Sequence, residues 1–277
     1  MASILLRPRL HFDDDKTVVG VIVLKTTMDI NCDMGESFGN WVMGDDKAMM
    51  SRITTANVAC GFHASDPVTM IETVKLAKNN DVVIGSHPGL PDLLGFGRRA
   101  MNITPEDAYA YMIYQTGALD AALRTEGMSL HHIKPHGAFY SILKDNTEIA
   151  SAVADAICAL STDPILYWPA PTSAALPSEA KKRGVRVVGE IYPDLQYAPD
   201  GALIIQREKH VTDVSFASEQ VELYVTSGSV KAVDGSLVEL DAESICVHGD
   251  GPNAIEVADA INNKLKDLDC DIEAIVA

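Results

Sequence analysis

The sequence predicts an α/β fold, a distorted (β/α) barrel of about seven parallel strands. After residue 27, short apolar runs alternate with stretches of helical character. Each apolar run ends in polar residues, and a parallel barrel gathers the carboxyl ends of its strands at one mouth. A length of 277 residues with 47% hydrophobic content suits a single barrel. A doubly wound open sheet is the alternative that this alternation allows.

The predicted strands are nearly continuous apolar runs, which suits burial on both faces of a parallel sheet. They cover residues 28–32, 56–60, 82–85, 132–134, 165–168, 185–191 and 244–247. The predicted helices cover residues 45–53, 67–79, 105–126, 147–160, 174–183, 217–227 and 253–268.

Two predicted helices have clear start signals. Asp66 precedes Pro67, and Thr104 precedes Pro105, so each pair offers a capping side chain followed by a proline in the first turn. Glycine just past a helix favours its termination. The glycines in such positions are Gly127 and Gly184.

The composition excludes several classes of partner. The formal net charge of -17 argues against nucleic acid and against an anionic membrane surface. No apolar run approaches the roughly 18 residues that a membrane span requires. The five cysteines form no Cys-x-x-Cys pair, which favours reduced thiols. These features together predict a cytoplasmic protein.

The chain divides into an extension, residues 1–27, and a single barrel domain, residues 28–277. The extension combines an acidic run at residues 13–15 with an apolar stretch at residues 18–24. That acidic run is unlike an organelle transit peptide, and the apolar stretch is short for a secretory signal. We expect the extension to lie outside the barrel and to contribute no catalytic group.

The first predicted strand carries three polar side chains on one face. Because strand side chains alternate, Asp29, Asn31 and Asp33 point into the barrel, while Ile30 and Cys32 face the helices. Polar groups inside a barrel are costly unless they are hydrogen-bonded or bind a ligand or cation. A purely structural polar network is the competing interpretation.

Four histidines directly follow predicted strands: His63, His87, His136 and His248. Neutral imidazole can transfer a proton near neutral pH or bind a divalent metal. Proton transfer is the stronger interpretation, because no compact motif such as His-Glu-x-x-His is present. A divalent metal would use oxygen and nitrogen ligands from Asp29, Asp33, His63 and His87.

Positive charge near these clusters comes from Arg98, Arg99 and Lys134. An arginine fork suits a substrate carboxylate or phosphate, although an ordinary salt bridge is the expected role of one of the two arginines. The chain has no phosphate-binding loop motif and no Gly-x-Ser-x-Gly elbow. Cys60 and Cys246 lie near strand ends and are interpreted as buried framework thiols.

Several ordered motifs resemble one known family. They are DINCDMGE at 29–36, ANVACGFHASDP at 56–67, HPGLPD at 87–92, GFGRR at 95–99, KPHGA at 134–138 and CVHGD at 246–250. From about Met28 to Leu265 the chain resembles the LamB/YcsF lactam-utilisation family, also called the 5-oxoprolinase A subunits. The resemblance implies a barrel like that of the glycoside hydrolase/deacetylase superfamily. It also implies ATP-dependent opening of 5-oxoproline, or a related lactam, to glutamate with two partner subunits.

Roles in that reaction can be assigned as expectations. The candidate catalytic residues are Asp33, His63, His87, Lys134, His136, Glu190, His248 and Asp250, and the candidate substrate-binding residues are Asn31, Arg98 and Arg99. An arginine would hold the substrate carboxylate, and Lys134 would stabilise the developing oxyanion or the transferred phosphate. Two positions depart from the family pattern: Leu195 stands where an arginine is common, and Ser65 replaces a usual glycine.

Two other functions stay open at this point. One is a metal-dependent hydrolase or deacetylase that needs no ATP. The other is a non-catalytic subunit that binds the lactam and presents it to a partner.

Overall fold

Parallel strands, paired side by side into a closed ring, form the centre of the molecule. The computed structural model describes residues 7–12, 18–204 and 210–276. Six parallel strands pair in the order β5-β4-β3-β12-β7-β6. They are β3 (Thr27–Met34), β4 (Thr55–Ala59), β5 (Val83–His87), β6 (Ile165–Pro169), β7 (Arg186–Ile191) and β12 (Ser244–Val247). Ile133 makes parallel bridges to Ser86 of β5 and to Leu166 of β6, so it joins the two ends of the row.

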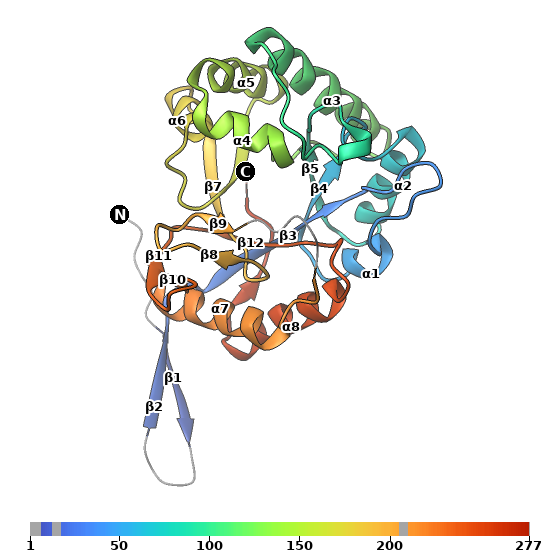
Figure 1. The fold of residues 1–277 in the computed structure, drawn as a ribbon. Coiled ribbons are helices and arrows are strands. Elements are labelled where there is room, and N and C mark those ends of the chain that lie inside the picture. The colour runs from blue at the N-terminus through green and yellow to red at the C-terminus, as the bar shows by residue number, and fades with distance from the viewer. Residues whose placement is uncertain (1–6, 13–17, 205–209, 277) are drawn as a thin grey trace.

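Helices surround most of this ring (Figure 1). They are α1 (Asp46–Met50), α2 (Pro67–Lys78), α3 (Pro105–Thr125), α4 (Gly137–Asp145), α5 (Thr147–Leu160), α6 (Ala175–Lys182), α7 (Val214–Ser227) and α8 (Ala254–Asp267), with a 3-10 turn, η1 (Leu93–Gly95). No helix within the described residues is long and apolar enough to cross a membrane. The predicted distorted α/β barrel is confirmed.

The predicted helix boundaries follow from their capping chemistry. Asp66 accepts hydrogen bonds from two backbone N–H groups in the first turn of α2. Thr104 forms a reciprocal capping box with Asp107 at the start of α3. Gly127 and Gly184 adopt positive φ angles just past α3 and α6, which favours glycine there.

The structure differs from the predicted elements at one strand and one helix. The strand expected at residues 132–134 is reduced to the bridge at Ile133, because Pro135 has no N–H with which to extend the ladder. Helix α4 begins directly after His136, where only a strand end was expected. Five short strands of the barrel region were also missed: β8 (Gln196–Tyr197), β9 (Leu203–Ile204), β10 (Ser229–Lys231), β11 (Leu237–Glu239) and β13 (Asp271–Ile272).

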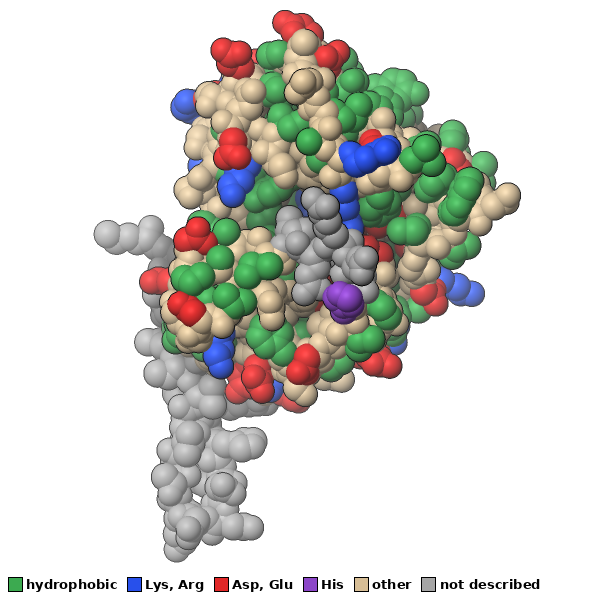
Figure 2. All heavy atoms as spheres, viewed as in Figure 1, with side chains coloured by type: hydrophobic (Ala, Val, Ile, Leu, Met, Phe, Trp, Pro, Cys, Tyr) green, Lys and Arg blue, Asp and Glu red, His purple; other side chains and the backbone are tan. Residues whose placement is uncertain are grey.

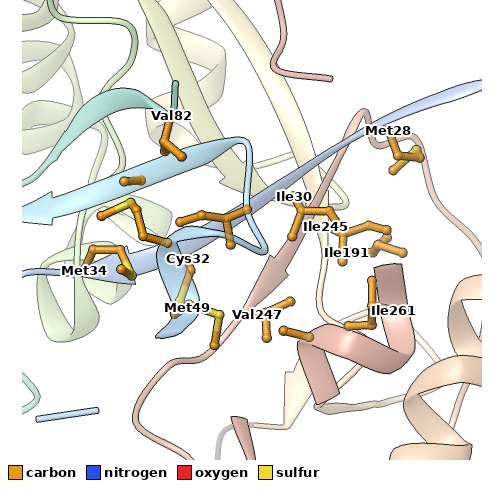
Figure 3. Packing of buried hydrophobic residues seen from close by; sticks show 14 of the residues in the cluster. Met28, Ile30, Cys32, Met34, Met49, Val82, Ile191, Ile245, Val247 and Ile261 are labelled. Atoms are coloured by element: carbon orange, nitrogen blue, oxygen red, sulfur yellow. The ribbon is translucent and has the colours of Figure 1, made fainter. Parts of the chain in front are cut away.

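The alternation along β3 separates the two sides of the barrel wall. Met28, Ile30, Cys32 and Met34 are buried in the main hydrophobic cluster, where Figure 3 shows them with residues of neighbouring elements such as Ile245. The residues between them point into the barrel and make polar contacts across it. Polar side chains of β3 therefore meet partners from several other strands.

The amino-terminal segment forms a hairpin of its own. Strands β1 (Arg7–Phe12) and β2 (Val18–Val23) pair antiparallel with each other. The hairpin extends away from the ring of helices in Figure 1. Leu24 and Lys25 then donate backbone hydrogen bonds to the carbonyl oxygen of Val225 in α7. At the other end of the chain, β13 (Asp271–Ile272) pairs with the start of β3.

Candidate functional site

A cavity of about 580 Å³ opens at the carboxyl ends of the barrel strands, within the size range of small-molecule sites. Among its lining residues are Asp33, His87, Arg98, Lys134, His136, Tyr192, Asp194 and His248. In Figure 2, a few Lys/Arg and Asp/Glu side chains and one His side chain border the grey residues near the centre of the visible face. Residues that lie more than two hundred positions apart therefore share one pocket.

Lys134 is the best-connected cation on the pocket floor. Its Nζ lies 2.9 Å from Glu190 Oε1, 3.0 Å from Asn31 Oδ1 and 3.1 Å from Cys246 Sγ. A further carboxylate oxygen, Asp33 Oδ1, is 3.6 Å away. Burial opposes the charged form, but the surrounding Cys246, Glu190 and Asp33 raise the pKa of Lys134 well above its usual value. The pocket thus holds a fixed ammonium group.

Asp33 lies between that ammonium and the histidines. Its Oδ2 is 3.3 Å from His87 Nε2, and its Oδ1 accepts a 2.9 Å hydrogen bond from Asn57. Burial alone would raise the pKa of Asp33, but the charges of His87 and Lys134 lower it well below its usual value. Asp33 is therefore a carboxylate that can balance positive charge at the pocket floor.

Three histidines and one glutamate form a compact group, which we call the His3Glu cluster: Glu36, His63, His87 and His136. One ligand atom from each lies within 4.8 Å of the others. The His63 and His136 rings stack with centroids 3.8 Å apart. His87 Nε2 is 2.9 Å from His136 Nδ1, and His63 Nε2 is 3.5 Å from Glu36 Oε1. This cluster could hold a divalent metal ion.

The cluster contains polar atoms without hydrogen-bond partners. Both ring nitrogens of His63 and Oε1 of Glu36 are buried and unsatisfied. Burial raises the pKa of Glu36 well above its usual value and lowers the pKa of His63 well below its own. Burial, with a contribution from His87, also lowers the pKa of His136 to about 3. In the absence of a cation, burial therefore disfavours the charged forms of these groups.

The opposite side of the pocket carries a histidine–aspartate pair. His248 Nδ1 is 2.8 Å from Asp194 Oδ2, which also accepts the backbone N–H of His248 at 3.1 Å. A carboxylate in this position fixes the tautomer and orientation of an imidazole. Asp250 does not line the cavity; its Oδ2 lies 3.6 Å from Nη2 of Arg98, which does.

The two arginines have different environments. Arg98 lines the cavity, and its guanidinium group also lies over the Phe96 ring. Arg99 instead pairs with Asp92 outside the cavity lining, and its side chain is 65% exposed. Asp92 also accepts the backbone N–H of Gly95, so this pair holds the η1 turn. Of the two arginines expected to bind substrate, Arg98 therefore lines the cavity and Arg99 makes a framework contact.

The four expected metal ligands do not form the group that has metal-ligand spacing. Asp29 lies four residues from Asp33 on β3, or about 13 Å at about 3.3 Å per residue, so the two carboxylates do not converge on one ion. Hydroxyl groups of Thr54, Thr55 and Tyr167 donate to Asp29, as does that of Ser244. The group with metal-ligand spacing keeps His63 and His87 and replaces the two aspartates by Glu36 and His136.

Glu36, Asp194 and Tyr192 were not singled out from the sequence. Glu36 reaches the cluster because Gly35, with φ of 69°, turns the chain after β3. Its place in the first motif was the only available signal. Asp194 lies in a loop, and Tyr192 follows β7 and donates a 2.9 Å hydrogen bond to Glu190. Neither Asp194 nor Tyr192 belongs to a periodic sequence pattern that would have predicted its place in the site.

The two departures from the family pattern have clear locations. Ser65 adopts a φ of 76°, a left-handed conformation that explains why glycine suits this position. Leu195 lines the cavity where a charged side chain was expected.

The cysteines have framework environments. Cys60 is buried, its thiol donates to the carbonyl of Val58, and burial raises its pKa to about 12. Burial likewise raises the pKa of Cys246 well above its usual value. High pKa values make both thiols poor nucleophiles near neutral pH.

Comparison with known proteins identifies the family. The model of the LamB/YcsF family matches residues 28–277. The chain is 45% identical over 243 residues to the 5-oxoprolinase A subunit of Thermococcus onnurineus, covering 87% of this chain and 94% of that protein. It is 43% identical over 237 residues to the protein of that name from Bacillus cytotoxicus, covering 85% and 93%. The crystal structure of the lactam utilization protein from Thermus thermophilus superposes with a TM-score of 0.84 at 39% identity, covering 90% of this chain and all of that one. This chain therefore belongs to the LamB/YcsF family.

Proposed function

We propose that this chain is the lactam-binding and ring-opening subunit of an ATP-dependent 5-oxoprolinase that works with partner subunits. The observation that carries the proposal is the grouping of Arg98, Lys134 and His248 around one cavity in a protein whose relatives are named as 5-oxoprolinase A subunits. Arg98 suits the carboxylate of 5-oxoproline, and Lys134 suits negative charge that develops on the ring carbonyl oxygen. The five cysteines are free thiols, which suits a cytoplasmic location.

The chemistry needs activation, because an amide carbonyl is a poor electrophile. Transfer of the terminal phosphoryl group of ATP to the carbonyl oxygen gives a phosphorylated ring and ADP. Water then adds to the ring carbon, and the C–N bond breaks as the nitrogen takes a proton, which leaves an acyl phosphate. A second water releases inorganic phosphate and glutamate. His248, oriented by Asp194, is placed to remove a proton from water and to return one to nitrogen.

The direct test measures loss of 5-oxoproline and formation of glutamate by this chain, alone and with candidate partner subunits, with and without ATP. We expect turnover only with ATP and partners, and loss of that turnover in His248→Gln. Turnover by the chain alone without ATP would instead favour a metal-dependent hydrolase. Binding of 5-oxoproline without turnover in any mixture would favour a presenting subunit.

A further inference from the structure

We propose that the His3Glu cluster is a binding site for one divalent transition-metal ion of the zinc class. The cluster combines three imidazole nitrogens and one carboxylate oxygen, a donor set that suits Zn²⁺ and neighbouring ions better than Ca²⁺ or Mg²⁺. The metal site stands apart from the proposed lactam chemistry, and each can fail without the other.

The hydrogen bonds of two histidines identify which nitrogen of each ring faces the centre of the cluster. His87 Nδ1 lies 2.7 Å from the carbonyl oxygen of Lys134, and His136 Nε2 lies 2.8 Å from that of Phe96. A carbonyl oxygen only accepts, so each of these nitrogens carries its ring's proton. This arrangement is typical of metal-ligating histidines, in which the outer N–H is fixed by a backbone carbonyl.

The remaining two nitrogens then require a cation. His87 Nε2 and His136 Nδ1 lie 2.9 Å apart, and neither has a proton if both rings are neutral. Two nitrogen lone pairs at this distance repel unless a proton or a metal ion lies near both. The geometry therefore calls for positive charge at this point of the pocket wall.

The other half of the cluster favours a metal ion over a proton. One proton between His87 and His136 would satisfy those two rings, but it would leave Glu36 Oε1 and His63 Nε2, which lie 3.5 Å apart, buried without a hydrogen bond. Such orphaned polar atoms are costly and rare in native proteins. A single metal ion accounts for all four atoms.

Tight packing holds His63 in place for this role. A Cβ atom added to Gly89 would lie 2.5 Å from His63 Nδ1, and one added to Gly97 would lie 2.6 Å from the His63 Cβ. Neighbouring backbone therefore packs directly against the ring, which also stacks on His136. The remaining nitrogen, Nε2, faces Glu36. Because His87 and His136 line the cavity, a bound ion would lie at the pocket wall.

The test uses the untagged full-length chain, stripped with a chelator and titrated separately with Zn²⁺ and Co²⁺. We expect one equivalent of zinc by elemental analysis after removal of free metal, and the visible absorption bands of nitrogen-coordinated Co²⁺. His63→Ala and Glu36→Gln should each weaken binding by more than the roughly 10–100-fold that loss of an outer-shell partner costs. Circular dichroism and thermal melting would check that both variants are folded.

The matched control is His248→Ala, which removes a histidine from the same cavity but outside the cluster, and it should keep one equivalent. The absence of stoichiometric binding in the wild-type chain would overturn the proposal. Binding that is equally strong in folded His63→Ala and Glu36→Gln would also overturn it, since the ion would then lie elsewhere.

Discussion

Two buried polar clusters lie near opposite ends of β3, and they differ in how fully their atoms are satisfied. The deep cluster surrounds Asp29, whose carboxylate accepts hydrogen bonds from hydroxyl groups on four neighbouring residues. The upper cluster contains Glu36 and His63, which together have three buried polar atoms without a hydrogen-bond partner. A satisfied buried network stabilises one structure, whereas a network with orphaned atoms at a cavity wall indicates a site that is completed by a ligand.

Lys134 gives the largest expected effect on stability. Its ammonium group lies between the buried carboxylate of Glu190 and the partly buried carboxylate of Asp33, so Lys134→Met should leave both without their main cation. Removal of one partner from a buried ion pair typically costs about 3–5 kcal/mol. Urea denaturation should show this loss in the free energy of unfolding. A loss below about 1 kcal/mol would mean that water already reaches this cation.

Asp29 and Glu36 test the comparison directly. Asp29→Ala should lower the free energy of unfolding by about 3 kcal/mol, because it leaves buried hydroxyl groups unpaired and creates a cavity. Glu36→Gln, made in the metal-free chain, should change it by less than about 1 kcal/mol, because it removes no hydrogen bond that the structure contains. Equal losses in the two variants, measured by urea denaturation with a chelator present, would contradict the distinction between the clusters.

The fold was predictable from the sequence because its signals are local. Proline and capping residues located the starts of α2 and α3, and apolar runs located the strands. The site was harder to predict from the sequence, because Glu36 reaches it only through the turn at Gly35. The alternation along β3 places Asp29 and Asp33 on one face of the strand. It does not bring their carboxylates together, because the two residues lie four positions apart along the strand. The hydrogen bonds of a buried polar side chain are made with side chains from other strands. A local sequence pattern therefore does not predict whether that side chain finds partners.

Arg98 and Arg99 provide a neighbouring pair with different expected effects. Arg98→Ala should raise the Michaelis constant for 5-oxoproline about 10-fold, with a smaller change in turnover, because it removes a pocket cation. Arg99→Ala should leave both constants nearly unchanged, because that exposed side chain pairs with Asp92 outside the cavity lining. Steady-state kinetics of the reconstituted enzyme would check both. An effect of Arg99→Ala as large as that of Arg98→Ala would contradict the proposal that Arg98 alone binds the substrate carboxylate.

Deletion of residues 1–27 should have the smallest effect. Strands β1 and β2 pair with each other, the family match begins at residue 28, and the deletion removes a few backbone hydrogen bonds to α7 and β13. The truncated chain should melt within a few degrees of the full chain and bind 5-oxoproline with unchanged affinity. Calorimetry measures both quantities. A truncated chain that does not fold, or that folds without binding, would show that the extension belongs to the working structure.

The distinction between the two clusters is tested most directly by anomalous diffraction at the zinc absorption edge, from crystals of the untagged chain grown with one equivalent of Zn²⁺. We expect one strong peak within bonding distance of Glu36, His63, His87 and His136, and none beside Asp29. A peak at Asp29, or no peak among the four ligands, would show that the orphaned atoms of the upper cluster do not mark a metal site.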